Sequence, residues 1–178
     1  NTVYKVQMEG LMRLKAMAKI NLGLDVLGKR EDGYHEVRMI MQTIRMYDIL
    51  DIRKTRRPGI VLTTNLPFIP TDQRNLVYKA AQMLMEEFDV EEGLSIKLRK
   101  FIPVAAGMAG GSSDAAAAFV GVNRMFHLGL TEEQLMERAV KVGADVPYCI
   151  MRGTALAEGI GEKLTRLPGL PKCYVLVG

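Results

Sequence analysis

The sequence predicts an α+β domain, and three observations support that fold class. Residues 16–26 alternate apolar and polar side chains, which is typical of a half-buried strand. Residues 75–88 repeat apolar side chains at helical spacing instead. The chain has 178 residues, 48% of them hydrophobic, which is enough to close the core of one domain.

The expected elements follow from these two periodicities. Strands are predicted wherever the alternation has a period of two, at residues 16–26, 37–45, 49–54, 60–64, 94–98, 154–158 and 172–177. Helices are predicted at residues 75–88, 115–125 and 131–143. The last of these opens with a capping box, Thr131 to Gln134, and the alanine-rich helix before it suits close packing on a sheet.

Composition and charge exclude several classes of protein. The net charge of +4 is a mild excess that suits an anionic ligand without requiring nucleic acid. The densest basic run, residues 53–57, favours a solvated hairpin tip, with phosphate or RNA contact as the alternative. No apolar run approaches the ~20 residues of a membrane span. The expected location is cytoplasmic, with no membrane or nucleic-acid partner.

Cysteines and histidines give no sign of a metal centre. Cys149 and Cys173 lack the paired spacing of zinc or redox motifs, so reduced thiols are expected. His35 and His127 lie far apart in the sequence without neighbouring cysteines. We therefore predict no metal ligands among the side chains.

A glycine-rich segment, residues 103–114, stands between a predicted strand and a predicted helix. Glycines let backbone N–H groups approach phosphate oxygens, and the helix N-terminus adds a favourable dipole. Ser112 and Ser113 would add hydroxyl donors. The alternative is that the glycines only permit close packing, with Ser113 or Asp114 capping the helix.

The spacing excludes the two commoner phosphate-binding loops. No lysine follows the glycines as a P-loop requires, and Gly107-x-x-Gly110-Gly111 differs from the dinucleotide fingerprint. The segment instead closely resembles the second motif of the GHMP kinases. That resemblance implies nucleotide binding by eleven consecutive residues: Pro103, Val104, Ala105, Ala106, Gly107, Met108, Ala109, Gly110, Gly111, Ser112 and Ser113.

Three further segments narrow the resemblance within this superfamily: residues 18–22, 30–35 and 143–147. They are similar to the members that act on the cytidine diphosphate derivative of methylerythritol, in the non-mevalonate route to isoprenoids. The resemblance implies transfer of the γ-phosphoryl group of ATP to the 2-hydroxyl of that substrate, with Mg²⁺. It also implies the superfamily's amino-terminal fold, a mixed β-sheet with packed helices related to a domain of ribosomal protein S5.

The resemblance assigns the chemistry to Lys19 and Asp145. A carboxylate that accepts the hydroxyl proton would make the hydroxyl a better nucleophile, and a nearby lysine would stabilise the developing negative charge. From the residues alone, alternation places Lys19 on the polar face of its strand, where a solvated lysine is the ordinary outcome. Asp145 precedes Val146 and Pro147, so a helix or turn cap is the alternative there.

The remaining site residues are assigned by resemblance in the same way. Asn21 shares the strand face of Lys19 and would contact the substrate. Tyr34 would stack on the cytosine ring and His35 would bond to its edge, although a loop-to-strand junction is the ordinary reading of these residues. Lys100 would line the adenine or ribose pocket, or simply form a basic strand end.

The organisation expected from this resemblance is one amino-terminal kinase domain over residues 1–178, with the family's carboxy-terminal domain absent. Two alternative functions remain: another GHMP kinase acting on mevalonate or homoserine, and an RNA-binding module that uses the same fold. The expected partner is the small-molecule substrate. A homodimer is left open.

Overall fold

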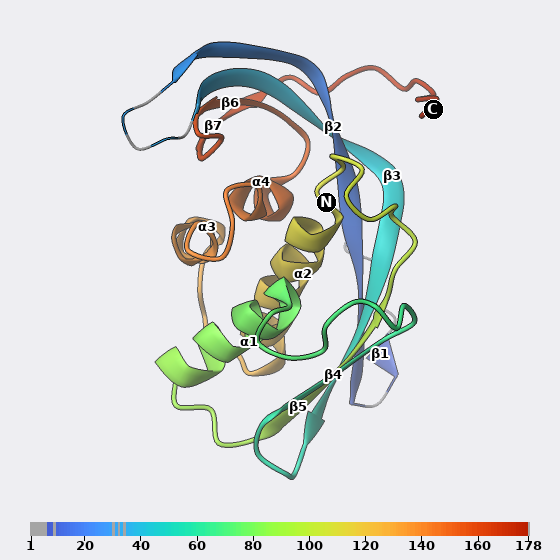
Figure 1. Ribbon diagram of the computed structural model, residues 1–178. Coiled ribbons are helices and arrows are strands. Elements are labelled where there is room, and N and C mark those ends of the chain that lie inside the picture. Colours follow the sequence, from blue (N-terminus) through green and yellow to red (C-terminus); the bar gives the residue numbers. More distant parts are fainter. Residues whose placement is uncertain (1–6, 9, 30, 32, 34, 178) are drawn as a thin grey trace.

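The computed structural model describes residues 7, 8, 10–29, 31, 33 and 35–177. One layer of helices packs on one face of a seven-stranded sheet (Figure 1). No helix within these residues combines the length and the apolar character needed to cross a membrane. The α+β class is confirmed.

Two long antiparallel strands form the centre of the sheet. They are β2 (Leu11–Lys29) and β3 (His35–Thr55), and the short β1 (Gln7–Met8) pairs with the start of β2. The main strand order is β1-β2-β3-β5-β4. Because β4 (Ile60–Thr64) runs parallel to β5 (Gly93–Arg99) while the other pairs are antiparallel, the sheet is mixed.

The edge of β3 opposite β2 is shared by two partners. Residues 49–55 pair with β5, and residues 37–42 pair with β6 (Thr154–Gly159), which in turn pairs with β7 (Lys163–Leu167). The segment 43–48 lies between these two registers. At that gap Asp48 accepts hydrogen bonds from the N–H groups of Phe101 and Ile102, immediately before the glycine-rich loop.

The described residues form four helices on one face of the sheet: α1 (Leu76–Glu87), α2 (Gly110–Met125), α3 (Glu132–Ala139) and α4 (Val146–Met151). The side chain of Asn75 caps α1 by accepting from the N–H of Val77. The capping box predicted at Thr131 and Gln134 is present in both directions. Helix α3 ends at Ala139, four residues before the expected end at residue 143.

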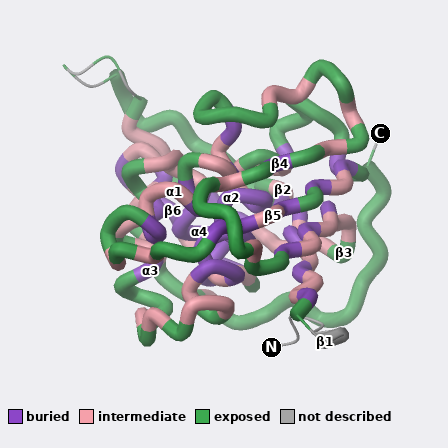
Figure 2. Tube along the Cα trace, turned by 90° about the horizontal axis from the view of Figure 1, so that it is seen from below, coloured by how far each residue is buried: buried purple, intermediate pink, exposed green. Residues whose placement is uncertain are grey.

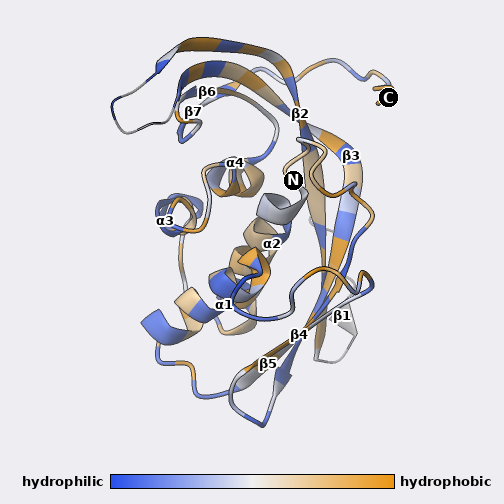
Figure 3. Ribbon diagram, viewed as in Figure 1, coloured by the Kyte–Doolittle hydropathy of each residue, from blue (hydrophilic) through white to orange (hydrophobic). Residues whose placement is uncertain are grey.

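The core lies between the sheet and the helices, where the buried positions concentrate (Figure 2). Helix α4 is buried and largely hydrophobic, whereas its neighbour α3 is mostly hydrophilic (Figure 3). Helix α2 approaches the sheet closely at Gly121, where an added Cβ would lie 2.4 Å from the Cδ1 of Ile52. The small residues of α2 permit this approach, as predicted.

The structure corrects several predicted boundaries. Residues 37–45 and 49–54 belong to one strand, β3, because β2 pairs along almost its whole length. The strand expected at 172–177 is wrong: the described part of that segment is not in a strand, and Tyr174 and Leu176 are almost fully exposed. Although the residues of this segment are mostly apolar, none of their side chains is buried. The partner of β6 is the unpredicted β7, which follows a turn with positive φ at Gly159 and Gly161.

The basic run at residues 53–57 is exposed but does not form a hairpin tip. Strands β3 and β4 are not paired, because β5 lies between them. Lys54 is 3.3 Å from the carboxylate of Glu92 and 4.6 Å from the ring centre of Phe126. The charges of this run are therefore partly engaged within the domain.

Both cysteines are free thiols, as predicted. Burial raises the pKa of the Cys149 thiol well above its ordinary value, and the nearby Asp145 carboxylate adds to that shift. This thiol lies inside α4 and is inert in ordinary conditions.

Candidate functional site

The glycine-rich loop has a backbone of alternating handedness. Ala105, Gly107 and Ala109 have φ of 60°, 71° and 54°, in the left-handed region. Glycine adopts this region freely, but each alanine is strained there by about 1–2 kcal/mol. Residues 103–107 are exposed, whereas the side chain of Met108 is buried against Ala18 and Ile102. Met108 therefore anchors the loop by packing.

Helix α2 begins within the predicted phosphate motif, five residues before the expected start. Its first residue is Gly110. At this end of the helix, the N–H of Ser113 donates to the carbonyl of Ala109, at 2.8 Å. The N–H groups of Gly110, Gly111 and Ser112 precede that bond and lack intrahelical acceptors. Together with the helix dipole they form a donor set suited to phosphate oxygens.

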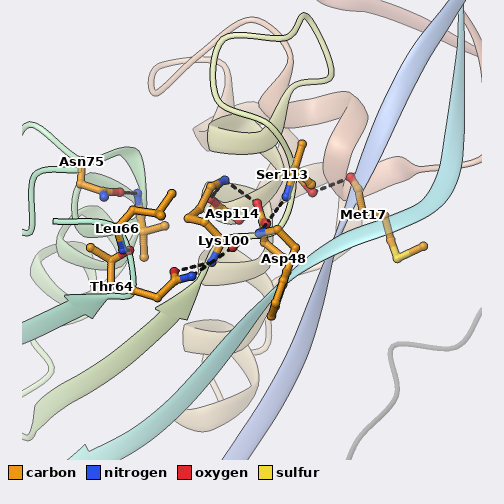
Figure 4. A network of polar contacts seen from close by, with 12 residues as sticks. Met17, Asp48, Thr64, Leu66, Asn75, Lys100, Ser113 and Asp114 are labelled. Carbon is orange, nitrogen blue, oxygen red and sulfur yellow. Dashed lines mark hydrogen bonds and ion pairs between the residues drawn. The ribbon is translucent and has the colours of Figure 1, made fainter. Parts of the chain in front are cut away.

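The two serines of this turn have different roles. The hydroxyl of Ser113 is buried and donates to the carbonyl of Met17 on β2, at 2.6 Å (Figure 4). That hydroxyl is therefore committed to the fold and is not available as a phosphate donor, contrary to the expectation for its side chain. Ser112 is only partly buried.

Lys19 lies on β2 where the pairing with β3 is irregular. The register shifts between Met17 and Lys19, so that Lys19 pairs with Thr43. The shift changes which positions of β3 face the core: Leu50 and Ile52 before it, and Met39 and Met41 after it. One residue of β2, Ala18, stands opposite three residues of β3, 44–46, and the consecutive residues Ala18 and Lys19 are both buried, so the strict alternation of faces is broken at this irregularity. Lys19 is thus 5% exposed and directed toward α4, not solvated as strict alternation predicted.

The backbone of Lys19 is bonded directly to the glycine-rich loop. Its N–H donates to the carbonyl of Met108 at 3.1 Å. One residue therefore joins the predicted phosphate loop to the predicted catalytic side chain. With the Ser113 bond to Met17, the loop is attached to β2 at two points.

The side chains of Lys19, Asn21 and Asp145 lie close together. The Nζ of Lys19 donates to the Oδ1 of Asn21 at 3.0 Å and lies 3.8 Å from the Oδ2 of Asp145. The lysine side chain is 6% exposed, whereas the Asp145 side chain is 31% exposed. The ammonium is sheltered, and the carboxylate is open to a ligand.

Asp145 occupies the N-cap position of α4 without acting as a cap. Its side chain makes no capping hydrogen bond, and Pro147 in the first turn removes one donor that a cap would satisfy. The capping alternative is therefore not supported for this carboxylate. Its oxygens face Lys19 instead.

Helix α4 is held in place from both strands of the central pair. The hydroxyl of Tyr148 donates to the carbonyl of Gly153 at 2.7 Å and lies 3.0 Å from the Oγ1 of Thr43. Burial raises the pKa of Tyr148 to about 12, so it remains a neutral donor. The partly buried guanidinium of Arg152 donates to the carbonyl of Lys15 at 2.9 Å. These bonds set the position of Asp145 relative to Lys19.

Lys100 is buried beneath the loop. Its ammonium is bonded to Asp48 and lies 2.6 Å from the Oδ2 of Asp114, and its side chain is 5% exposed. It directly follows the last residue of β5, so it is a basic strand end, as the alternative had it, but a buried one. Both partners of this ammonium are protein carboxylates, so the geometry lends no support to its predicted contact with adenine or ribose, which stays a prediction.

Of the two residues predicted to bind cytidine, only His35 can be placed relative to the Lys19–Asp145 pair. Tyr34 lies outside the described residues. His35 is exposed at the start of β3, opposite Lys29. That register is ten residues along β2 from Lys19, or roughly 33 Å of strand at ~3.3 Å per residue. The far ends of β2 and β3 curve, which shortens the distance through space (Figure 1).

Sequence reasoning missed the two carboxylates around Lys100. Asp48 has the same parity along β3 as the core residues Leu50 and Ile52, and it is fully buried. A charged residue at a core position is a signal that could have identified it. Within the described residues no group of three acidic, histidine or cysteine side chains is placed to hold a metal ion.

Known proteins resemble this chain in sequence and in fold. Residues 75–153 match the family model described as the GHMP kinases N terminal domain. The 4-diphosphocytidyl-2-C-methyl-D-erythritol kinase of Lachnospira eligens is 57% identical over 166 residues, which cover 93% of this chain and 58% of the relative. The enzyme of the same name from Clostridium botulinum strain Eklund 17B is 54% identical, over 93% of this chain and 59% of the relative.

Solved structures extend the comparison. A crystal structure of 4-(cytidine 5'-diphospho)-2C-methyl-D-erythritol kinase matches with a TM-score of 0.77 and 35% identity, over 88% of this chain and 55% of that one. Homoserine kinase from Cytophaga hutchinsonii matches with a TM-score of 0.72 at 19% identity, over 94% and 55% of the two chains, which shows the fold alone. The chain thus spans somewhat more than half the length of the relatives it matches.

Proposed function

We propose that this chain, which resembles the GHMP kinases over residues 75–153, forms the nucleotide-binding part of an ATP-dependent kinase acting on 4-diphosphocytidyl-2-C-methyl-D-erythritol. The product would carry a new phosphate on the 2-hydroxyl. The observation that carries the proposal is the placement of the Lys19–Asp145 pair beside the loop, through the Lys19 N–H bond to Met108.

The proposed reaction uses the difference between the two side chains. The 2-hydroxyl oxygen attacks the γ-phosphorus, the bond from that phosphorus to the bridging oxygen breaks, and ADP leaves. The carboxylate of Asp145 accepts the hydroxyl proton as the new bond forms. Lys19 stabilises the negative charge shared by the nucleophile and the phosphoryl group, and Asn21 orients the ammonium.

The loop and the first turn of α2 would hold the nucleotide phosphates. The unbonded N–H groups at residues 110–112 supply donors, and the helix dipole favours the negative charge. Mg²⁺ usually binds through substrate phosphates and one or two protein groups, so it would not need a cluster of protein ligands, and the part of the chain that the structure describes holds none. When bound, it would neutralise phosphate charge.

The substrate proposal extends to residues and parts beyond this pair. We propose that Tyr34 and His35 recognise the cytosine and that the protein is cytoplasmic. A homodimer is left as an open alternative. The relatives are longer than this chain. We propose that the part of them beyond this chain completes the nucleotide and acceptor sites.

The test is an ADP-release assay on the full-length gene product with ATP and Mg²⁺. The acceptors are the cytidylyl methylerythritol, mevalonate and homoserine at equal concentration. We expect ADP formation with the cytidylyl compound and not with the other two. Comparable turnover of mevalonate or homoserine would overturn the proposed substrate.

A further inference from the structure

A buried network of charged side chains lies beneath the glycine-rich loop (Figure 4). We propose that Asp48, Lys100 and Asp114 are positioning residues that fix both ends of the loop to β3, so that nucleotide affinity depends on them and turnover does not. The inference rests on the proposed function, because it assigns the loop to the nucleotide.

Asp48 holds the entry to the loop. Its Oδ1 accepts from the N–H of Phe101 at 2.5 Å and from the N–H of Ile102 at 2.8 Å, immediately before Pro103. The carboxylate comes from the segment of β3 between the β5 and β6 registers. The backbone thus leaves β5 and turns into the loop against a fixed acceptor.

Lys100 joins the entry of the loop to its exit. The ammonium binds Asp48 and, at 2.6 Å, the Oδ2 of Asp114 on the second turn of α2. An added Cβ on Gly110 would lie 3.1 Å from this ammonium, so the start of α2 rests directly on it. One side chain therefore sets the distance between the strand end and the helix that the loop connects.

Asn65 fastens the same point from the neighbouring strand end. Its Oδ1 accepts from the backbone N–H of Lys100 at 2.7 Å, and its Nδ2 donates to the carbonyl of Lys100 at 3.1 Å. Asn65 is exposed, unlike the three charged residues. It can be replaced without opening the core.

The two carboxylates do not contribute equally. Asp48 makes two backbone bonds in addition to its ion pair, whereas the Oδ1 of Asp114 is buried without a hydrogen-bond partner among the described residues. Burial raises the pKa of Asp114 well above its ordinary value, and the Asp48 carboxylate raises it further. Asp48 therefore holds the loop, and Asp114 mainly receives the ammonium.

None of the three side chains can act on the reaction directly. Asp48 is 0%, Asp114 2% and Lys100 8% exposed, and their charged atoms face one another. Their influence must pass through the backbone of residues 101–114. A change in nucleotide binding with unchanged turnover is the signature of such a role.

The test compares Asp48→Asn with Asp51→Asn in the full-length gene product. Asp51 is a matched control: it is three residues along the same strand and also paired with two cations, Arg13 and Arg99, but it does not touch the loop. Losing charge-assisted bonds at Asp48 should raise KM for ATP by about tenfold or more. The values of kcat and of KM for the acceptor should change less than about twofold, as should all three values for Asp51→Asn.

Asn65→Ala provides a second measurement that does not depend on a buried substitution. It should raise KM for ATP by about threefold with kcat unchanged, because two bonds to Lys100 are lost. If Asp48→Asn fails to fold, this variant decides the matter. Unchanged KM for ATP in the folded variants, or an equal fall of kcat, would overturn the inference. A wild-type protein that neither binds a non-hydrolysable ATP analogue nor releases ADP would overturn the proposed function, and this inference with it.

Discussion

Two lysine–carboxylate arrangements lie on either side of the glycine-rich loop, and they differ in exposure and in contact. Lys19 and Asp145 are 3.8 Å apart, and the carboxylate is 31% exposed. Lys100 is in direct contact with Asp48 and Asp114, whose side chains are 0% and 3% exposed. The same residue types thus form one open pair and one closed network.

This difference in exposure suits the Lys19–Asp145 pair to catalysis and the Lys100 network to supporting the fold. A partly exposed carboxylate that makes no capping bond can accept a proton from a bound hydroxyl, as Asp145 would. A buried carboxylate in contact with an ammonium and backbone N–H groups, as Asp48 is, has no access to a substrate. Removing a cation should therefore cost activity at the open pair and stability at the closed network.

Exchange of the two lysines for methionine should give the largest effects. Lys100→Met leaves two carboxylates buried without their cation, which should lower the free energy of unfolding by about 3–5 kcal/mol. Lys19→Met should change that free energy by only about 1 kcal/mol, because Asp145 is partly solvated. It should instead lower kcat by about 10²–10³.

Urea unfolding and ADP release, measured on both variants, check this comparison. Equal losses of stability in the two variants would show that the open pair is structural. A Lys100→Met protein as stable as the wild type would show that the closed network does not support the fold.

The pH dependence of Asp114→Asn should sharpen the account of the closed network. The folded-state pKa of Asp114 is raised, mainly by burial. The stability contributed by its proton is complete below the ordinary value of about 3.9 and is lost as pH rises toward the folded-state pKa. Asparagine does not titrate, so the variant should gain stability relative to the wild type as the pH rises above about 4. A difference that is constant with pH would contradict the assignment.

The smallest effect is expected at the strained loop. Ala109→Gly relieves a left-handed alanine, worth about 1–2 kcal/mol, against a glycine entropy cost of about 0.5–1 kcal/mol. The variant should be more stable by up to about 1 kcal/mol in urea unfolding. Ala106→Gly is the matched control, because Ala106 is not among the residues with positive φ, and it should lose stability. A loss at both positions would mean that Ala109 is not strained.

Local patterns in the sequence predicted the elements well where one periodicity holds throughout. The helix at 75–88 and the strand at 60–64 agree with α1 and β4 within one residue. The motif at 103–114 follows a strand as predicted, but its last five residues, 110–114, already belong to α2. The residue at which the loop ends and α2 begins was not predicted. Tertiary contacts such as the Ser113 bond to Met17 extend α2 into glycines that disfavour helix.

The position of Lys19 shows why alternation alone could not build the site. The pattern placed Lys19 opposite Ala16 and Ala18, on a solvated face. An irregularity in the pairing of β2 with β3 breaks that alternation and buries Lys19 beside α4, and it depends on partner residues 24 to 30 positions away in the sequence. Likewise, the contact of Lys100 with Asp48 spans 52 residues and has no local signature.

The central claim is that Asp145 accepts the substrate proton while the loop holds the nucleotide. Asp145→Asn in the full-length gene product tests it, by kcat for the cytidylyl methylerythritol together with the dissociation constant of a non-hydrolysable ATP analogue. We expect kcat to fall by about 10²–10⁴, the range of general-base contributions, with nucleotide affinity unchanged within about twofold. Near-normal turnover would contradict the role of Asp145, and a parallel loss of nucleotide binding would contradict the separation of the two regions.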